Sequence, residues 1–420
     1  MHTTDAPWLS IDPDSKTASI DTSHPGFYGD PYSTYERIRA AAPVFYWREQ
    51  RLWCFLNAAD VGAVLKDRRF GRELLPPPGQ AAGEPEAPEH LREFHAFNRT
   101  SMLEREPPVH TRLRNLVSRA FLTRNIDRLR PRIAALAGEL VERMRPAGEA
   151  ELLSAFATPI PVTVIAELLG VPAAMAPQLL AWSHRMVAIY ELGKTRATED
   201  AAETATREFS EFIRDYVAER RRSSADDLIT HLIASEAAGD RLTEDELIGT
   251  CILLLNAGHE ATVHAIGNAV KTLLEQGTDT AAAFADDAAT ERAVEECLRF
   301  DPPLHLFRRY VQEDLEIAGV RLPRGTEVAL LYGAANRDPA RYEDAGRFVP
   351  SRPTPGGASA HAAFGGGIHF CLGAPLARLE LQVALPALFR GLPGLRLRGS
   401  PRYKDAYHFH GLEALNVAWP

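Results

Sequence analysis

The ten residues Phe364–Gly373, FGGGIHFCLG, constrain this chain more than any other segment. They place Cys371 at the end of a glycine-rich turn, directly before a helical pattern that starts at Ala374 and has Pro375 in its first turn. A thiol at that point faces the positive end of a helix and free backbone amides, so we expect its pKa to be lowered. A thiolate held in this way is suited to ligate iron.

Taken separately, these features have ordinary explanations. A lone cysteine is most often a small buried apolar residue, and a run of glycines by itself indicates a flexible loop. The combination is far more specific, because six of the ten positions carry defined residues: Phe364, Gly365, Gly367, His369, Cys371 and Gly373. This combination resembles the haem-binding loop of the cytochrome P450 superfamily. The resemblance continues in the following helix, at Leu376, Ala377, Arg378 and Glu380.

The resemblance implies that Cys371 is the axial ligand of a haem b iron, and that Phe364, Gly365 and Gly373 help to bind this cofactor. It also implies the fold of the family, which is mainly α with small β-sheets. In that fold a helix-rich prism holds the haem between a long central helix and the cysteine loop. We expect residues 1–420 to form a single domain of this kind.

The composition is that of a soluble globular protein. The chain has 420 residues, 45% of them hydrophobic, which suffices for a large, subdivided core. Its net charge of −9 argues against a nucleic-acid partner. The N-terminus lacks a signal-peptide pattern, and no stretch approaches the roughly 18–20 apolar residues of a membrane span. Its 4 cysteines lack metal-binding spacing and fit a reducing compartment, so we expect a cytoplasmic monomer.

Apolar residues recur with helical spacing along most of the chain. The spacing predicts helices over Tyr32–Ala42, Ala58–Lys66, His110–Ala120, Leu129–Met144, Pro161–Leu169, Ala174–Ile189, Ala201–Arg221, Glu244–Gln276, Ala288–Phe300 and Ala374–Phe389. Short strands are predicted at Val44–Trp47, Leu52–Phe55, Leu315–Ile317 and Glu327–Leu331. We therefore expect the β-rich portion mainly at 43–60 and 315–335, with C-terminal turns. The irregular stretches 75–89 and 351–363 suggest a mobile loop and the family's meander, respectively.

The longest predicted helix, Glu244–Gln276, begins with a capping box formed by Thr243 and Glu246. Its centre, residues 257–262, reads AGHEAT and so combines a mid-helix glycine with a carboxylate. A glycine there costs about 1 kcal/mol relative to alanine. The pattern alone is compatible with close helix packing and a solvated Glu260. With Cys371 in the same chain, a functional site is the better interpretation.

This helix centre resembles the oxygen-binding helix of the family. The resemblance implies that Ala257 and Gly258 leave space for dioxygen above the haem and that Glu260 relays protons. The family commonly has an alcohol directly after the acid, whereas this chain has Ala261 there and Thr262 one residue later. One residue is a rotation of about 100°, so Thr262 cannot simply replace the missing group. We expect ordered water or a hydroxyl of the substrate to compensate.

Glu296 and Arg299 have the spacing of a helical ion pair, which contributes little on an exposed surface. They resemble the E-x-x-R motif of the family. The resemblance implies a buried structural network shared with Arg347, which holds the cysteine loop from behind.

Haem carries two carboxylates that need cationic partners. A basic residue alone is usually a solvated surface charge. By resemblance, four residues match positions that bind the haem carboxylates: His110, Arg114, Arg309 and His369. Substrate contacts are expected, again by resemblance, from four parts of the chain. The residues we assign to this pocket are Phe97, Leu255, His259, Leu304, Leu306, Phe307 and Phe409. Most are apolar, as suits a hydrophobic ligand.

The resemblance implies a haem-dependent monooxygenase that hydroxylates a hydrophobic small molecule with O2 and with electrons from a separate ferredoxin and ferredoxin reductase. A basic cluster is either a solvated face or a docking patch for an acidic ferredoxin: Arg112, Arg119, Arg124, Arg128 and Arg130. Other oxidations of the family remain alternatives, namely epoxidation, dealkylation, aromatic coupling and peroxide-driven oxidation. An alternative of another class is a non-catalytic haem-thiolate sensor or electron carrier. The sequence does not identify the substrate.

Overall fold

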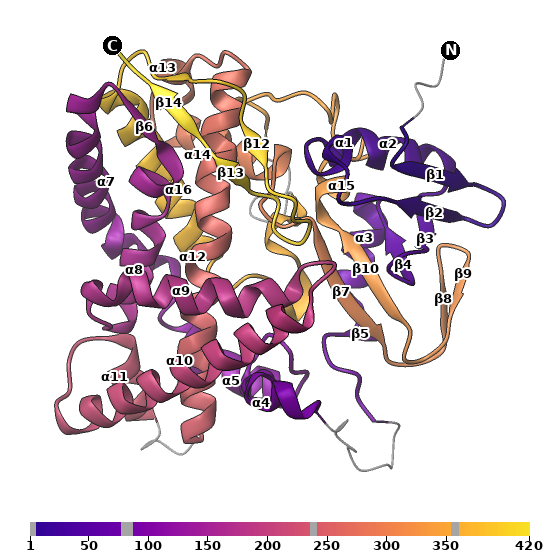
Figure 1. Ribbon diagram of the computed structural model, residues 1–420, viewed down its shortest axis with the longest axis horizontal. Helices are drawn as coiled ribbons and strands as arrows, with labels where there is room; N and C mark the ends of the chain where they lie inside the picture. The colour runs from indigo at the N-terminus through magenta and orange to yellow at the C-terminus, as the bar shows by residue number, and fades with distance from the viewer. Residues whose placement is uncertain (1–5, 77–86, 236–241, 354–360) are drawn as a thin grey trace.

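The structure is a computed structural model that describes residues 6–76, 87–235, 242–353 and 361–420. Helices fill one side of the molecule and a twisted sheet forms the other (Figure 1). The mobile loop predicted within 75–89 and the centre of the meander predicted at 351–363 lie outside the described residues.

The helices agree closely with the predicted ones. The α-helices are α1 (Pro25–Tyr28), α2 (Pro31–Ala41), α3 (Ala58–Lys66), α4 (Arg92–Thr100), α5 (Val109–Ser118), α6 (Thr123–Ile126), α7 (Arg130–Met144), α8 (Pro159–Leu169), α9 (Ala176–Val187), α10 (Arg196–Arg222), α11 (Leu228–Ser235), α12 (Glu244–Glu275), α13 (Thr280–Ala283), α14 (Asp287–Phe300), α15 (Tyr332–Asn336) and α16 (Ala374–Gly391). Every predicted helix is present, with ends shifted by a few residues at most.

The strands are short and come from distant parts of the chain. They are β1 (Leu9–Asp12), β2 (Thr17–Ile20), β3 (Val44–Trp47), β4 (Leu52–Phe55), β5 (Phe70–Gly71), β6 (Glu149–Glu151), β7 (Leu306–Val311), β8 (Leu315–Ile317), β9 (Val320–Leu322), β10 (Glu327–Leu331), β11 (Arg396–Leu397), β12 (Arg402–Tyr403), β13 (Leu412–Ala414) and β14 (Asn416–Ala418). In the described residues, the largest sheet has the order β1-β2-β3-β4-β10-β7-β5. The four predicted strands have the predicted bounds.

The β-rich portion is larger than we predicted, because β1, β2 and β7 also belong to the main sheet. We did not predict β7, because Arg308 and Arg309 interrupt its apolar residues and because Pro302 and Pro303 lie shortly before it. The sheet joins the two predicted portions directly, since β4 pairs in parallel with β10.

Helix α12 passes through the helical part of the molecule, as Figure 1 shows. It starts with the predicted capping box, in which the Thr243 side chain accepts a hydrogen bond from the Glu246 amide, and the Glu246 carboxylate accepts one from Thr243. The helix contacts α8, α10, α14 and α16, and most of its residues are buried. Burial on nearly all sides explains why this helix can be apolar around its circumference.

Candidate active site

The cysteine loop folds back on itself before α16 begins. The Cys371 amide donates a hydrogen bond of 2.9 Å to the Phe364 carbonyl, which closes the turn. Gly365 and Gly367 have φ angles of 66° and 65°, in the left-handed region that favours glycine. A Cβ at Gly367 would also collide with the carbonyl oxygen of Leu65, at the end of α3. The glycines therefore let the loop pack against α3 and turn its cysteine inward.

Cys371 lines an internal cavity, where its sulfur is shielded from bulk water. Burial raises the pKa of this thiol, while the Gly373 amide and the Arg114 guanidinium lower it to a smaller extent. Our expectation of a lowered pKa is therefore wrong for the protein alone. The amides and the positive charge are placed as predicted, but removal of the sulfur from water outweighs them. Binding of a metal ion to this sulfur would have to displace the thiol proton.

Helix α12 and the cysteine loop both contribute to the wall of this cavity. Each of the five residues that we predicted there lines the cavity: Ala257, Gly258, Glu260, Ala261 and Thr262. Gly258 also serves close helix packing, because a Cβ at this position would lie 2.7 Å from the Ile165 side chain of α8. Gly258 therefore lines the cavity and also lets α8 pack closely against α12.

The four predicted cationic residues all line the same cavity. His369 lies 2.9 Å from a carboxylate oxygen of Glu106. His110 is buried, and neither of its ring nitrogens has a hydrogen-bond partner. Burial and the neighbouring His369 and Arg114 lower the pKa of His110 to about 4. Arg114 donates a hydrogen bond to the Phe370 carbonyl, and Arg309 donates to the Arg308 carbonyl and also contacts the Tyr332 hydroxyl.

Four of the seven predicted pocket residues line the cavity, namely Phe97, Leu304, Phe307 and Phe409. The other three do not. Leu255 and His259 are one helical turn apart and lie on a buried face of α12, where His259 Nδ1 is 2.7 Å from the Leu255 carbonyl. Leu306 neighbours Phe307 on β7, so its side chain points to the opposite face of the sheet and packs in the core there.

A cytochrome P450 family model matches residues 270–392 of this chain. The cytochrome P450 monooxygenase PikC of Streptomyces venezuelae is 37% identical over 403 residues, which cover 94% of this chain and 92% of that protein. This chain belongs to the cytochrome P450 family. The 6-deoxyerythronolide B hydroxylase of Saccharopolyspora erythraea is 36% identical to this P450 and covers 96% of it, with 95% of its own length matched.

Solved structures agree with this assignment. P450BioI, in a complex with an acyl carrier protein that carries hexadec-9Z-enoic acid, superposes on this P450 with a TM-score of 0.86. The two are 33% identical, and the match covers 94% of this chain and 100% of P450BioI. The fold prediction is confirmed. The relatives are monooxygenases and hydroxylases, so this P450 is an oxidoreductase of the monooxygenase class.

The residues around the cavity fit the haem-thiolate cofactor that the family implies. A haem-thiolate centre needs one cysteine sulfur, and Cys371 on the cavity wall is the residue that would hold the iron. The carboxylates of a haem need donors. No carboxylate of a described residue forms an ion pair with Arg114 or Arg309, and His110 has two unsatisfied ring nitrogens. Guanidinium groups without a carboxylate partner, and a buried imidazole without any partner, are expected at a site that binds an anionic group.

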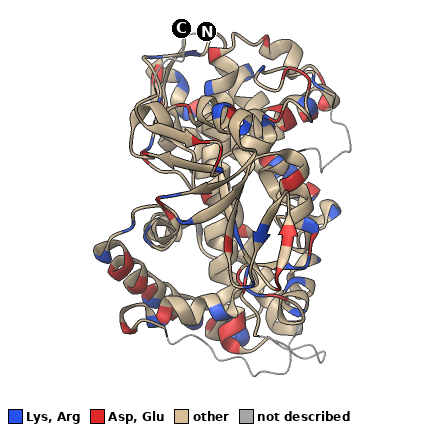
Figure 2. Ribbon diagram, turned by 90° about the vertical axis from the view of Figure 1, so that its right-hand side faces the viewer, with Lys and Arg blue, Asp and Glu red and all other residues tan. Residues whose placement is uncertain are grey.

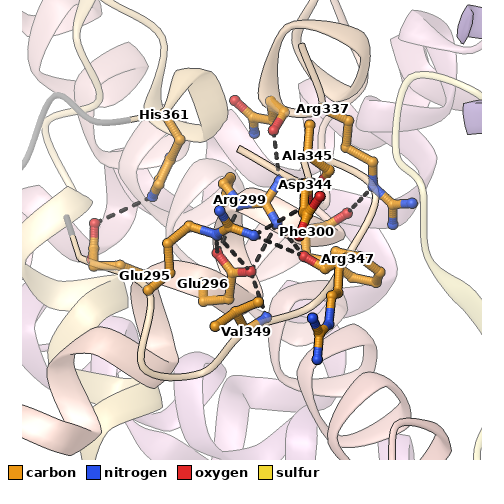
Figure 3. A network of polar contacts seen from close by, with 12 residues as sticks. Glu295, Glu296, Arg299, Phe300, Arg337, Asp344, Ala345, Arg347, Val349 and His361 are labelled. Atoms are coloured by element: carbon orange, nitrogen blue, oxygen red, sulfur yellow. Dashed lines mark hydrogen bonds and ion pairs between the residues drawn. The ribbon is translucent and has the colours of Figure 1, made fainter. Parts of the chain in front are cut away.

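The buried network next to the cysteine loop contains Glu296 and Arg299, as predicted (Figure 3). Arg299 donates hydrogen bonds of 2.7 and 2.8 Å to the Glu296 carboxylate. Arg347 takes part in this network through its backbone carbonyl, which accepts a hydrogen bond from Arg299, while its guanidinium points away from Glu296 (Figure 3). The second guanidinium on Glu296 is that of Arg352, at 3.1 Å, and the Val349 amide also binds this carboxylate.

Sequence reasoning missed several residues that line the cavity. Arg72, next to β5, adds a guanidinium, and it is already paired with Glu104. Ile165 of α8 and Met186 of α9 contribute apolar surface, as does Tyr190. None of these residues belongs to a recognisable motif. Their position depends on how α8 and α9 cross α12, which local sequence does not specify.

None of the helices in the described part of the chain is long and apolar enough to cross a membrane.

Proposed function

We propose that this P450 hydroxylates a largely hydrophobic small molecule with O2 and with electrons from a separate ferredoxin and ferredoxin reductase. The main support for this proposal is the cavity, in which Cys371 and Glu260 lie on walls that are otherwise mainly apolar. An apolar cavity with a few convergent polar groups is typical of a site for a hydrophobic ligand. The relatives support hydroxylation in particular, because one is a 6-deoxyerythronolide B hydroxylase and another a mycinamicin IV hydroxylase/epoxidase.

The protein contributes anchoring, orientation and proton delivery. In this proposal Cys371 ligates haem b, and His110, Arg114, Arg309 and His369 bind its carboxylates. A bound haem supplies the reductive activation of O2, which is chemistry that protein side chains cannot provide. The apolar wall positions a C–H bond and excludes water from the cavity.

Glu260 is the group that we assign to proton transfer. Burial raises its pKa, but the neighbouring imidazoles of His184 and His264 outweigh this effect and hold the pKa of Glu260 well below its usual range. The carboxylate is therefore charged before it accepts a proton. Its place on the cavity wall lets it pass that proton inward.

The electron donor is proposed to be an acidic ferredoxin. Arg119, Arg124, Arg128 and Arg130 are exposed around α6, whereas Arg112 forms an ion pair with Glu246. Elsewhere, basic and acidic residues alternate along many helices (Figure 2). A cluster of exposed arginines can steer a negatively charged partner towards this side of the molecule.

The function is tested in two steps on the haem-loaded enzyme. Hydrophobic compounds are first screened for a low- to high-spin shift of the haem spectrum, which reports a ligand close to the iron. The best compound is then incubated with O2, NADPH, a ferredoxin and its reductase, and products are identified by mass spectrometry. We expect a product heavier by one oxygen atom. Spin-shifting compounds that are never oxidised would contradict the proposal and favour a sensor.

The variant Ala261→Thr tests how this P450 compensates for the missing alcohol. Ala261 lines the cavity, so a threonine hydroxyl would enter it. If water or a substrate hydroxyl already serves, the ratio of product formed to NADPH consumed should change by less than about twofold, since a redundant donor adds little. A large gain in this ratio would show that no compensating route exists. Ala265→Thr, one turn further along the same wall, controls for the loss of space.

A further inference from the structure

Three histidine side chains surround the Glu260 carboxylate. His184 Nε2 and His259 Nε2 lie 3.3 and 3.5 Å from Oε2, and His264 Nε2 lies 3.5 Å from Oε1. His259 and His264 belong to α12, like Glu260 itself, whereas His184 comes from α9. Two helices thus bring imidazoles to one carboxylate.

The pair of His184 and Glu260 extends from the outer surface to the cavity. The His184 side chain is 58% exposed, and this residue does not line the cavity. Met186, two residues later on α9, does line it. Two residues correspond to a rotation of about 200° on a helix, so the two side chains lie on opposite faces of α9. The exposed surface of His184 therefore faces outside, while Glu260 faces inside.

His259 Nε2 and Glu260 Oε2 face each other, and neither atom carries a hydrogen that it could donate to the other. His259 Nδ1 lies 2.7 Å from the Leu255 carbonyl, which can only accept, so this nitrogen carries the ring proton. Burial lowers the pKa of His259, which favours the neutral form of the ring. Its Nε2 is then an acceptor that faces a carboxylate oxygen, and neither atom has a hydrogen-bond partner. A protonated Glu260 would satisfy both atoms.

Of the three histidines, His184 alone is exposed, since the side chains of His259 and His264 are 4% and 5% accessible. We propose that His184 is the solvent end of a proton path that supplies Glu260. This inference rests on the proposed function, and it concerns residues outside the acid that the family motif predicts.

The proposed step is balanced. Hydroxylation of a substrate RH follows RH + O2 + 2e⁻ + 2H⁺ → ROH + H2O, so each turnover needs two protons from solvent. For each of them, the Nε2–H bond of protonated His184 breaks and an O–H bond forms on Glu260. Glu260 releases the proton to the cavity, and His184 takes up another from the water that contacts its exposed ring.

The variant His184→Gln tests the path by comparing two oxidants. O2 with ferredoxin and reductase requires two protons from solvent, whereas hydrogen peroxide brings its own: RH + H2O2 → ROH + H2O. With the compound chosen by the spin-shift screen, we expect the ratio of the O2-driven to the peroxide-driven rate to fall about tenfold in His184→Gln. The loss should be smaller than for a group that acts directly, because water can partly replace a surface imidazole.

His231→Gln is the matched control. His231 is also an exposed histidine beside a carboxylate, since its side chain is 65% exposed and lies 3.5 Å from Asp226. It belongs to α11 and does not line the cavity. Its ratio should equal that of the wild type. An unchanged ratio in His184→Gln would overturn the path. Absence of product with both oxidants in the wild type would instead contradict the proposed function.

A second readout does not depend on activity. His184 Nε2, His259 Nε2 and Glu260 Oε2 are all within 4.8 Å of one another. Two of their separations, 3.3 and 3.5 Å, match the roughly 3.4 Å between ligands of a tetrahedral Zn²⁺ ion. We expect calorimetry to detect Zn²⁺ binding to the untagged, haem-loaded enzyme and to His231→Gln, with an affinity at least about tenfold lower in His184→Gln. Equal Zn²⁺ affinities of the wild type, His231→Gln and His184→Gln would show that His184 does not lie next to His259 and Glu260, and would overturn the path.

Discussion

A Cys371→Ala variant should lose the thiolate signature in the carbon-monoxide difference spectrum of the reduced protein and should retain severalfold less haem. The reason is that the thiol of Cys371 is the one sulfhydryl on the cavity wall. The other three cysteines of the chain, Cys54, Cys251 and Cys297, are buried elsewhere. No neighbouring thiol can therefore replace the lost ligand.

The control for this prediction is Cys54→Ala, which removes a fully buried sulfur from β4. This variant should lose some stability, as large-to-small core changes do, but it should keep the thiolate spectrum. Haem content is measured per polypeptide after purification of both variants in parallel. A thiolate-type spectrum in Cys371→Ala would disprove the role proposed for this residue.

Glu296→Gln should be among the most destabilising single substitutions in the chain. The Glu296 side chain is 1% exposed, and its carboxylate accepts hydrogen bonds from Arg299, Arg352 and the Val349 amide. An amide of the same size would leave two guanidinium groups without their counter-charge and would turn one donor towards another. Removing one partner of a buried ion pair costs about 3–5 kcal/mol, which we expect to see as a lower urea midpoint.

The chain offers a control with the same geometry. Glu142 of α7 and Arg145, directly after the end of this helix, form an ion pair with the same spacing, but their side chains are 68% and 50% exposed. Glu142→Gln should leave the midpoint almost unchanged, because solvent screens the charges at the surface. If the two substitutions had equal effects, burial of the network would not be what makes Glu296 important.

Two kinds of signal made the fold predictable from the sequence. The capping box at Thr243 and the apolar periodicity of α12 are local, and they gave the long central helix nearly to the residue. The short strands β3, β4, β8 and β10 were predicted with their exact bounds because apolar and β-branched residues concentrate there. The charged strand β7 was missed, since its arginines are tolerated only because the cavity and the pairing with β10 accommodate them.

The predictions for the site failed where they depended on the direction of a side chain. Leu255 and His259 were assigned to the pocket because the helix that carries them resembles the oxygen-binding helix, but helical rotation turns their side chains away from the cavity. The network was expected to include Arg347, and it does so through the backbone carbonyl, whereas the guanidinium of Arg352, which was not predicted, binds Glu296. The contact between His184 and Glu260 joins two helices that are far apart in the sequence, so no local sequence pattern predicts it.

X-ray absorption at the iron edge of the purified ferric enzyme would examine the metal–sulfur bond itself. The structure places one thiol on the cavity wall, so we predict a single sulfur atom bonded to iron in the wild type and none in Cys371→Ala. An iron bonded only to nitrogen and oxygen in the wild type would contradict the account.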